Sequence, residues 1–349
     1  MSGSTFHPGQ DIGGFVILKP LGKGGMAELF LARDRVLKRR VVIKVLNPVV
    51  GKRKGFRRQF LREARIQAGL DNPRIVQVLQ GLEEGADLCL VMQYVQGTDL
   101  EKVIKKARAL REKKGAPGAL SVERSVHIFL QVLEGVGFVH KYKIIHGDIK
   151  PSNILLDRQG RAKVADFGLA FLMSYERRHG GSFFHGGTPY YMSPEQVLNQ
   201  GMDFRSDIYA LGVTFFHMIT GRFPFGEKKR YMELVECHME GSLDDAREIL
   251  AECGEIPPRI KEAIFKALEN DPEKRHQSCL EFALAIQQET SHEMYSELLR
   301  LNLLGKKEIT PSERAYLDEI AAKKSLSREE ARSLEENIRN EMGLPPLQA

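Results

Sequence analysis

The sequence predicts an α+β protein with two lobes, the first rich in strands and the second mostly helical. Residues 15–46 and 75–94 consist of short β-branched and apolar runs separated by turns, a pattern typical of strands. From Ser121 onward, apolar residues recur mainly at helical spacing. A strand-rich part of about 90 residues followed by a helix-rich part of about 190 indicates two lobes with a cleft between them.

The individual elements follow from periodicity. β-branched and apolar residues predict strands at 15–19, 28–32, 40–46, 75–79 and 88–94. A helix is expected over 56–69, because Phe60, Leu61, Ala64 and Ala68 recur at three- and four-residue intervals. Short extended segments at 144–146, 154–156 and 162–165 interrupt the helical part.

The composition excludes several classes of protein. With 42% hydrophobic and 28% charged residues among 349, the chain is neither disordered throughout nor fibrous. No uncharged apolar stretch approaches the roughly 18 residues of a membrane span, and the N-terminus lacks a secretory signal pattern. Four scattered cysteines without CxxC pairing favour reduced thiols and a cytoplasmic location over disulfides or a zinc site.

The positive charge is concentrated in the N-terminal third. The net charge is +6, yet residues 1–115 hold 23 Lys or Arg against 11 Asp or Glu, mainly in runs at 35–40, 52–65 and 102–114. Solvated surface is the favoured interpretation. The alternative is a docking surface for an acidic partner, nucleic acid or anionic lipid. Nucleic acid is disfavoured because no aromatic residues interleave these runs.

The last 60 residues predict a helical hairpin. Thr310-Pro311-Ser312-Glu313 and Ser327-Arg328-Glu329-Glu330 both have the form of a capping box, and Gly343 with Pro345 ends the second helix. Such a hairpin is too small for a core of its own. We therefore expect its apolar faces to pack on the main domain or on a second copy of the chain.

Two motifs lie in the strand-rich part. LGKGGMAEL (21–29) places glycines between two strands, where backbone N–H groups can approach phosphates. Alone, this motif is explained as well by a glycine turn in a hairpin. In VVIK, Lys44 projects from an apolar strand, and an inward-facing Glu63 on the following helix would pair with it.

Two further motifs carry oxygen ligands and a base. IIHGDIKPSNILL (144–156) places Asp148 and Asn153 five residues apart, with Lys150 between them. A carboxylate that accepts a hydroxyl proton and an amide that binds Mg²⁺ are the requirements of phosphoryl transfer. In VADFGLA, Asp166 ends a strand and can hold a metal that bridges phosphates.

In this order, the four motifs resemble the protein-kinase superfamily, specifically the bacterial eukaryotic-like (Hanks-type) serine/threonine kinases. The resemblance covers about residues 11–289 and includes LVMQYVQGTDL (90–100), GTPYYMSPE (187–195), SDIYALG (206–212) and DPEKR (271–275). It implies a bilobal kinase-like fold and the following organisation: a flexible N-terminus 1–10, a kinase domain 11–289 with N-lobe 11–95 and C-lobe 96–289, and a helical extension 290–349.

The resemblance also implies roles for individual residues. Lys44 would hold the α- and β-phosphates of ATP and pair with Glu63. Asp148 would be the catalytic base and Lys150 would steady the γ-phosphate. Asn153 and Asp166 would bind Mg²⁺, with Mn²⁺ as an alternative ion. The implied nucleotide contacts are Leu21, Gly22, Lys23, Gly24, Gly25, Met26, Ala27, Glu28, Leu29, the gatekeeper Met92, Gln93, Val95, Asp99 at the ribose, and Leu155. Asp207 would anchor the catalytic loop, and Glu195 would pair with Arg275.

Three departures from the family pattern stand out. Ala27 replaces the third glycine of the loop. Gln67, four residues after Glu63, stands where an apolar residue is usual and puts the packing of its helix in question. The usual His-Arg-Asp reads His146-Gly147-Asp148.

The resemblance implies ATP-dependent transfer to serine or threonine of a protein substrate, since Lys150 and Thr188 resemble that branch. Two alternatives stay open. His-Gly-Asp also resembles small-molecule kinases, and a pseudokinase scaffold would bind partners without turnover. A homodimer is a further option for the assembly.

Overall fold

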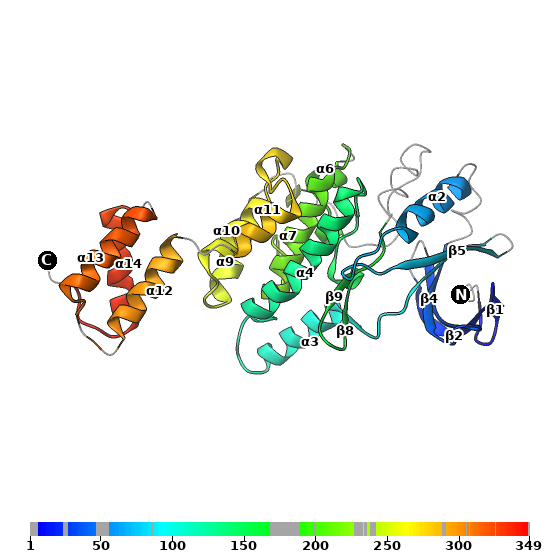
Figure 1. Cartoon of the computed structure of the whole chain (residues 1–349), viewed down its shortest axis with the longest axis horizontal. Helices are drawn as coiled ribbons and strands as arrows, with labels where there is room; N and C mark the ends of the chain where they lie inside the picture. Colours follow the sequence, from blue (N-terminus) through cyan, green and yellow to red (C-terminus); the bar gives the residue numbers. More distant parts are fainter. Residues whose placement is uncertain are drawn as a thin grey trace. The chain divides into compact units, whose positions relative to one another are not determined.

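The computed structural model describes residues 6–23, 27–46, 56–84, 87–167, 189–198, 200–226, 233, 236–237, 242–287, 291–304, 306, 308–324 and 326–347. They belong to two compact units (Figure 1). One consists of Met1–Gly254 with Ile264–Phe282, and the other of Glu255–Ala263 with Ala283–Ala349. Within the described ranges, every helix is too short or too polar to cross a lipid bilayer.

In the described residues, the N-lobe contains a six-stranded antiparallel sheet in the order β1-β2-β3-β4-β6-β5 and the helix α2, which packs on β5. The elements are β1 (Asp11–Ile12), β2 (Phe15–Lys23), β3 (Ala27–Asp34), β4 (Arg40–Leu46), α2 (Phe56–Ala68), β5 (Val78–Glu84) and β6 (Asp87–Gln93). Apolar side chains of alternate strand positions, including Ile17, Phe30 and Ile43, form a buried cluster. The strand-rich character predicted for the N-lobe is confirmed.

Two predictions for the N-lobe need correction. Residues 6–10 were assigned to a flexible terminus, but Phe6 is buried and its ring lies edge-on to Phe30, with centroids 5.8 Å apart. The strand expected at 75–79 begins only at Val78. Ile75 makes an isolated bridge to Val164, and its side chain packs beside Leu70. Its apolar character reflects this contact rather than a place in the sheet.

The C-lobe is helical around a small sheet of order β7-β8-β9. Its elements are β7 (Gly97–Asp99), α3 (Leu100–Glu112), α4 (Val122–Lys141), η1 (Pro151–Asn153), β8 (Ile154–Asp157), β9 (Ala162–Val164), η2 (Pro189–Tyr191), α6 (Pro194–Val197), α7 (Phe204–Thr220), α9 (Asp244–Glu252), α10 (Pro258–Ala267), η3 (Pro272–Lys274) and α11 (Cys279–Gln287). Helices α4 and α7 form the centre, where Phe129 and Phe215 stack with centroids 4.3 Å apart. The segment 144–146, expected to be extended, is a loop.

The C-terminal helices do have a core of their own, contrary to the expectation of a hairpin that must dock elsewhere. Helix α12 (Ser291–Leu303) joins the two predicted helices, α13 (Pro311–Lys323) and α14 (Arg328–Glu341). Both capping boxes form as predicted. A buried apolar cluster, made by Tyr295, Leu299, Leu303, Leu317, Ala321, Leu326 and Ile338, joins all three helices. The sequence indicates that a helix ends at 298–304, but not that this helix, α12, packs with the hairpin and supplies three of these side chains.

A buried carboxylate and two arginines also hold this C-terminal unit together. Arg314 donates two hydrogen bonds to the Glu335 carboxylate, at 2.6 and 2.9 Å, and Arg339 donates a third at 3.1 Å. The side chain of Glu335 is 2% exposed. Burial opposes ionisation of Glu335, but the hydrogen bonds from the two arginines outweigh it and lower its pKa. The unit is therefore held by directional contacts as well as by apolar burial.

Gly97 offers a direct test of the packing of β7 against β8. A Cβ at this position would lie 1.8 Å from the carbonyl oxygen of Leu156 on β8. We expect Gly97→Ala to lower the free energy of unfolding by about 3 kcal/mol or more, because the backbone of β8 would have to move. In Gly22→Ala, where the added methyl meets no atom within 4 Å, the change should be small. Equal losses in urea unfolding of the two variants would contradict this interpretation.

Candidate active site

The buried carboxylate of Asp207 on α7 holds the loop that contains Asp148. It accepts hydrogen bonds from the backbone N–H groups of His146 and Gly147, both at 2.8 Å. The Nε2 of His140 lies 2.8 Å from the same carboxylate. Asp207 is 1% exposed, so these donors replace water around its charge. The predicted anchoring role of Asp207 agrees with this geometry.

His146 connects the loop to the strand end that carries Asp166. Its Nε2 lies 2.9 Å from the carbonyl oxygen of Ala165, and its Nδ1 lies 3.2 Å from the N–H of Asp148. A carbonyl can only accept and an N–H can only donate, so both contacts are satisfied by a neutral ring protonated at Nε2. The ring also lies beside Phe167, with centroids 4.8 Å apart.

Gly147 has a left-handed backbone, with φ of +76°. Glycine adopts this conformation without steric cost, whereas a residue with a Cβ pays for it. Its N–H is bonded to Asp207, and its carbonyl accepts a hydrogen bond from Nε2 of Gln196 at 3.1 Å. Both backbone polar groups of this residue are therefore paired.

The side chains of Asp148, Lys150 and Asn153 converge. The Lys150 ammonium donates to the Asp148 carboxylate at 2.9 Å, and Nδ2 of Asn153 donates to the same carboxylate at 3.0 Å. Nδ2 of Asn153 also bonds the carbonyl of Asp148 at 2.8 Å. These contacts orient the carboxylate of Asp148, whose side chain is about one quarter exposed. It is placed to accept a proton from a hydroxyl group.

Lys44 and Asp166 form an ion pair across the site. Nζ of Lys44 lies 2.7 Å from Oδ1 of Asp166, and both side chains are largely buried. Burial opposes ionisation of Asp166, but the ammonium of Lys44 outweighs it, with a smaller contribution from Lys150, and lowers the pKa of Asp166. The expected partner Glu63 lies on α2, but its side chain is outside the described residues.

The donor chemistry at Asn153 and Asp166 fits a magnesium ion. Because Nδ2 of Asn153 makes both hydrogen bonds to Asp148, its amide oxygen is directed away from that residue. Backbone N–H of Ala165 bonds the carbonyl of Asn153 at 2.8 Å, which ties the two ligand positions together. Mg²⁺ is commonly held by one or two protein oxygens together with phosphates. Among the described residues, no cluster of three or more His, Cys, Asp or Glu side chains is suited to a metal.

An apolar surface lies beside these groups. Met92, 7% exposed, belongs to a buried cluster against which Ala27, Val95 and Leu155 pack. This brings together predicted contacts from β3, the segment after β6, and β8. Val42 and Ala165 join the same cluster and were not predicted, although they stand in the VVIK and VADFG motifs. Such a surface fits a planar base.

The remaining predicted nucleotide contacts are distributed around the sheet. Leu21 and Gly22 end β2, and Lys23 forms an ion pair with Glu28 across the turn. Leu29 follows in β3, and Gln93 ends β6. Gly24, Gly25 and Met26 lie outside the described residues.

Asp99 has a contact that the sequence did not indicate. Its carboxylate caps α3 by accepting from the N–H of Lys102 at 2.9 Å, and the Lys102 ammonium pairs with it at 2.7 Å. The predicted ribose contact would therefore come from a carboxylate already fixed in place.

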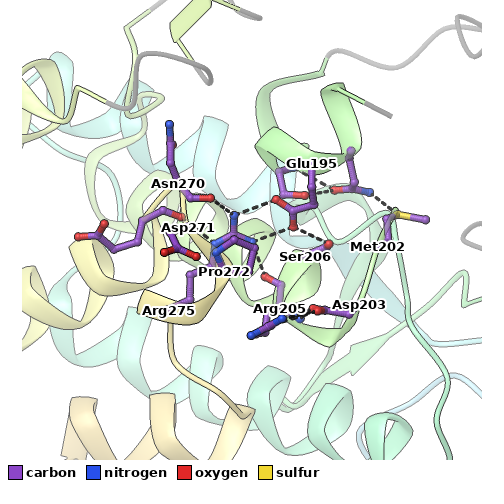
Figure 2. A network of polar contacts seen from close by, with 12 residues as sticks. Glu195, Met202, Asp203, Arg205, Ser206, Asn270, Asp271, Pro272 and Arg275 are labelled. Carbon is purple, nitrogen blue, oxygen red and sulfur yellow. Dashed lines mark hydrogen bonds and ion pairs between the residues drawn. The ribbon is translucent and has the colours of Figure 1, made fainter. Parts of the chain in front are cut away.

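A buried ion pair links α6 to the segment around η3 (Figure 2). Arg275, whose side chain is fully buried, donates to both oxygens of the Glu195 carboxylate at 2.8 Å. Ser206 donates to the same carboxylate at 2.6 Å. Other donors of Arg275 reach the carbonyls of Arg205, Glu269 and Asn270. Burial opposes ionisation of Glu195, but the bond from Arg275 outweighs it and lowers the pKa of Glu195.

The two lobes, the lysine–aspartate pair and the loop aspartate define a kinase-type protein. Residues 15–290 match the protein kinase domain family, and the chain belongs to that family. It is 34% identical over 267 residues to serine/threonine-protein kinase PrkC of Bacillus subtilis. This match covers 76% of this chain and 39% of PrkC. It is 33% identical over 284 residues to serine/threonine-protein kinase PknF of Mycobacterium tuberculosis. This match covers 80% of this chain and 56% of PknF.

Among solved structures, the chain is similar to the kinase domain of Mycobacterium tuberculosis PknI, with a TM-score of 0.61 and 26% identity. That match covers 81% of this chain and 98% of the other. The bacterial Hanks-type resemblance is thereby confirmed. The chain spans 39% of the length of PrkC and 56% of that of PknF, so part of each relative has no counterpart here.

The pair Glu195–Arg275 should contribute strongly to stability. We expect Arg275→Met to lower the free energy of unfolding by about 3–5 kcal/mol, because it leaves a buried carboxylate without its counter-charge. Arg222→Met is the matched control, since its pair with Glu252 is partly exposed and should contribute below about 1 kcal/mol. Denaturant unfolding of both variants would measure the difference, and similar losses would contradict the assignment.

The same pair predicts an acid dependence. Because the folded-state pKa of Glu195 is lowered, its stabilisation is complete above the ordinary carboxyl pKa and is lost as pH falls through the folded-state value. The stability difference between wild type and Arg275→Met should therefore shrink in acid.

Proposed function

We propose that the chain is an ATP-dependent protein serine/threonine kinase. The observation that carries this proposal is the Asp148 carboxylate, which Lys150 and Asn153 orient by hydrogen bonds. Asp166, which follows the nearby strand β9, forms an ion pair with Lys44. Related proteins that bear the name serine/threonine-protein kinase support the protein substrate. ATP and Mg²⁺ are the proposed cofactors, with Mn²⁺ as an alternative.

In the proposed mechanism, Asp148 accepts the proton of the attacking serine or threonine hydroxyl. Lys150, hydrogen-bonded to Asp148, is placed to offset charge on the transferring phosphoryl group. Lys44 holds the other phosphates, while Asn153 and Asp166 would hold the metal ion. When bound, the ion neutralises charge on phosphate oxygens. The apolar surface around Met92 and Leu155 would position the base.

The two alternatives have weaker support. A pseudokinase would lack a catalytic group, yet Lys44, Asp148, Asn153 and Asp166 are all present. A small-molecule kinase is suggested only by Gly147, whereas Lys150 beside the base favours a protein substrate. The cytoplasmic location, the homodimer and the acidic partner stay predictions from the sequence. Several cations of the basic runs have local partners, such as Lys105 with Glu101, in line with a solvated surface.

Phosphate transfer with Mg-ATP to casein-type protein and to small alcohols tests this proposal. We expect transfer to serine and threonine of the protein alone. In Asp148→Ala, turnover should fall by at least roughly a hundredfold while ATP still binds, because the proton acceptor is lost but Lys44 and the apolar contacts of the base remain. The control Asp244→Ala removes an exposed aspartate of α9. Near-wild-type turnover of Asp148→Ala would contradict the assignment of the base.

Regulation without loop phosphorylation is a second part of the proposal. In related kinases, the arginine that precedes the catalytic aspartate grips a phosphate on the activation loop. Here that position is Gly147, and two helper positions hold Gln59 and Phe171 rather than cations. The candidate acceptors Ser174, Ser182 and Thr188 lie outside the described residues, as do Arg177, Arg178 and His179, which could supply a substitute pocket.

Phosphatase-treated enzyme should accordingly transfer phosphate to an exogenous substrate without a lag. Ser174→Ala and Ser182→Ala should show wild-type initial rates, because no charge-assisted bonds to Gly147 can form. A lag that prior autophosphorylation removes, or a large rate loss in either variant, would overturn this prediction.

A further inference from the structure

Gln67 lies in the last turn of α2, and its side chain is turned into the protein. It is 8% exposed, and its Nε2 donates a hydrogen bond to the backbone carbonyl of Phe167 at 3.0 Å. Phe167 directly follows Asp166, so this bond joins a helix of the N-lobe to the segment that carries the proposed metal ligand. An apolar residue at this position would have no such contact.

The carbonyl groups on both sides of Asp166 are held by side-chain donors. The carbonyl of Ala165 is bonded to His146, and the carbonyl of Phe167 is bonded to Gln67. The first donor belongs to the catalytic loop and the second to α2. The backbone around Asp166 is thus fixed from two independent elements.

Asp166 needs such restraint because its backbone is left-handed, with φ of +63°. A residue with a Cβ keeps this conformation only where its surroundings impose it. If the donor from α2 were removed, the buried carbonyl of Phe167 would lack this partner, which is costly. The backbone of Phe167 would then be favoured to turn its carbonyl toward another donor, and this movement would release the left-handed backbone of the neighbouring Asp166 and turn its carboxylate away from Lys44.

We infer that Gln67 is a positioning residue for the metal ligand. Its amide holds the Phe167 carbonyl, keeps Asp166 directed at the phosphate site, and makes that orientation depend on the position of α2. The inference rests on the proposed function, because the orientation matters only if a metal-bound nucleotide is used. It also gives a physical reason for the polar residue where the family usually has an apolar one.

The test compares nucleotide binding with and without Mg²⁺ by calorimetry. In Gln67→Met, which keeps the size of the side chain but removes the donor, ATP affinity without Mg²⁺ should be unchanged. The gain in affinity on adding Mg²⁺ should fall by roughly five- to thirtyfold. Gln67→Leu serves as the second variant. In both variants, kcat/KM for phosphate transfer should fall by a similar factor, and most of this loss should come from weaker binding of Mg-ATP.

Leu61→Ala is the matched control on the same helix. Leu61 faces Gly81 of β5 and packs on the apolar cluster that contains Met92, so its truncation removes apolar contacts while α2 and the amide of Gln67 stay in place. It should lower the melting temperature but retain the Mg²⁺-dependent gain.

Three results would overturn the inference: no Mg²⁺-dependent gain in wild type, an unchanged gain in Gln67→Met and Gln67→Leu, or an equal loss in Leu61→Ala. A wild-type chain that binds Mg-ATP but transfers no phosphate would contradict the proposed function instead, and the binding data would still decide the role of Gln67.

Discussion

One buried charge, the carboxylate of Asp207, orders the active site. It accepts hydrogen bonds from two successive backbone N–H groups, those of His146 and Gly147. These bonds fix the direction of the catalytic-loop backbone just before Asp148. His146, oriented in this way, reaches Ala165 and so connects the loop to Asp166. Because Asp207 lies on the almost fully buried helix α7, the precision of the catalytic groups derives from the packing of the C-lobe core. A loop alone could not hold side chains so closely.

Neutral amides make two of the contacts that hold the backbone around this site. Gln196 bonds the carbonyl of Gly147, and Gln67 bonds the carbonyl of Phe167. A neutral amide neither attracts a phosphate strongly nor changes charge with pH. Contacts of this kind keep the loop and the metal-binding segment in place without a change in net charge. Ion pairs are retained where a charged ligand must be met, at Lys44 with Asp166 and at Lys150 with Asp148.

The sequence predicted residue types at motif positions well, because their spacing along the chain survives folding. Lys44, Asp148, Asn153 and Asp166 lie where three short motifs place them, and the three strands over 15–46 follow from local pattern. Contacts between distant segments could not be predicted in this way. The pairing of Gln67 with Phe167 joins residues 100 positions apart, and the family resemblance indicated only that an amide stood where an apolar residue is usual. Ile75 was misassigned because a buried loop residue and a strand residue have the same apolar signal.

The C-terminal helices show why a burial argument needs the right number of elements. Two capped helices cannot bury their apolar faces, but a third changes the outcome, since Tyr295, Leu299 and Leu303 of α12 fill the space between them. The buried Glu335 between two arginines adds a constraint that apolar packing does not impose, because an ionised carboxylate is tolerated there only if both donors are in register. The three helices are thus specified as a unit by their own contacts. Most of the apolar faces that the sequence left without a partner therefore pack within the unit, while Leu301, Leu304 and Tyr316 remain at least half exposed on its surface.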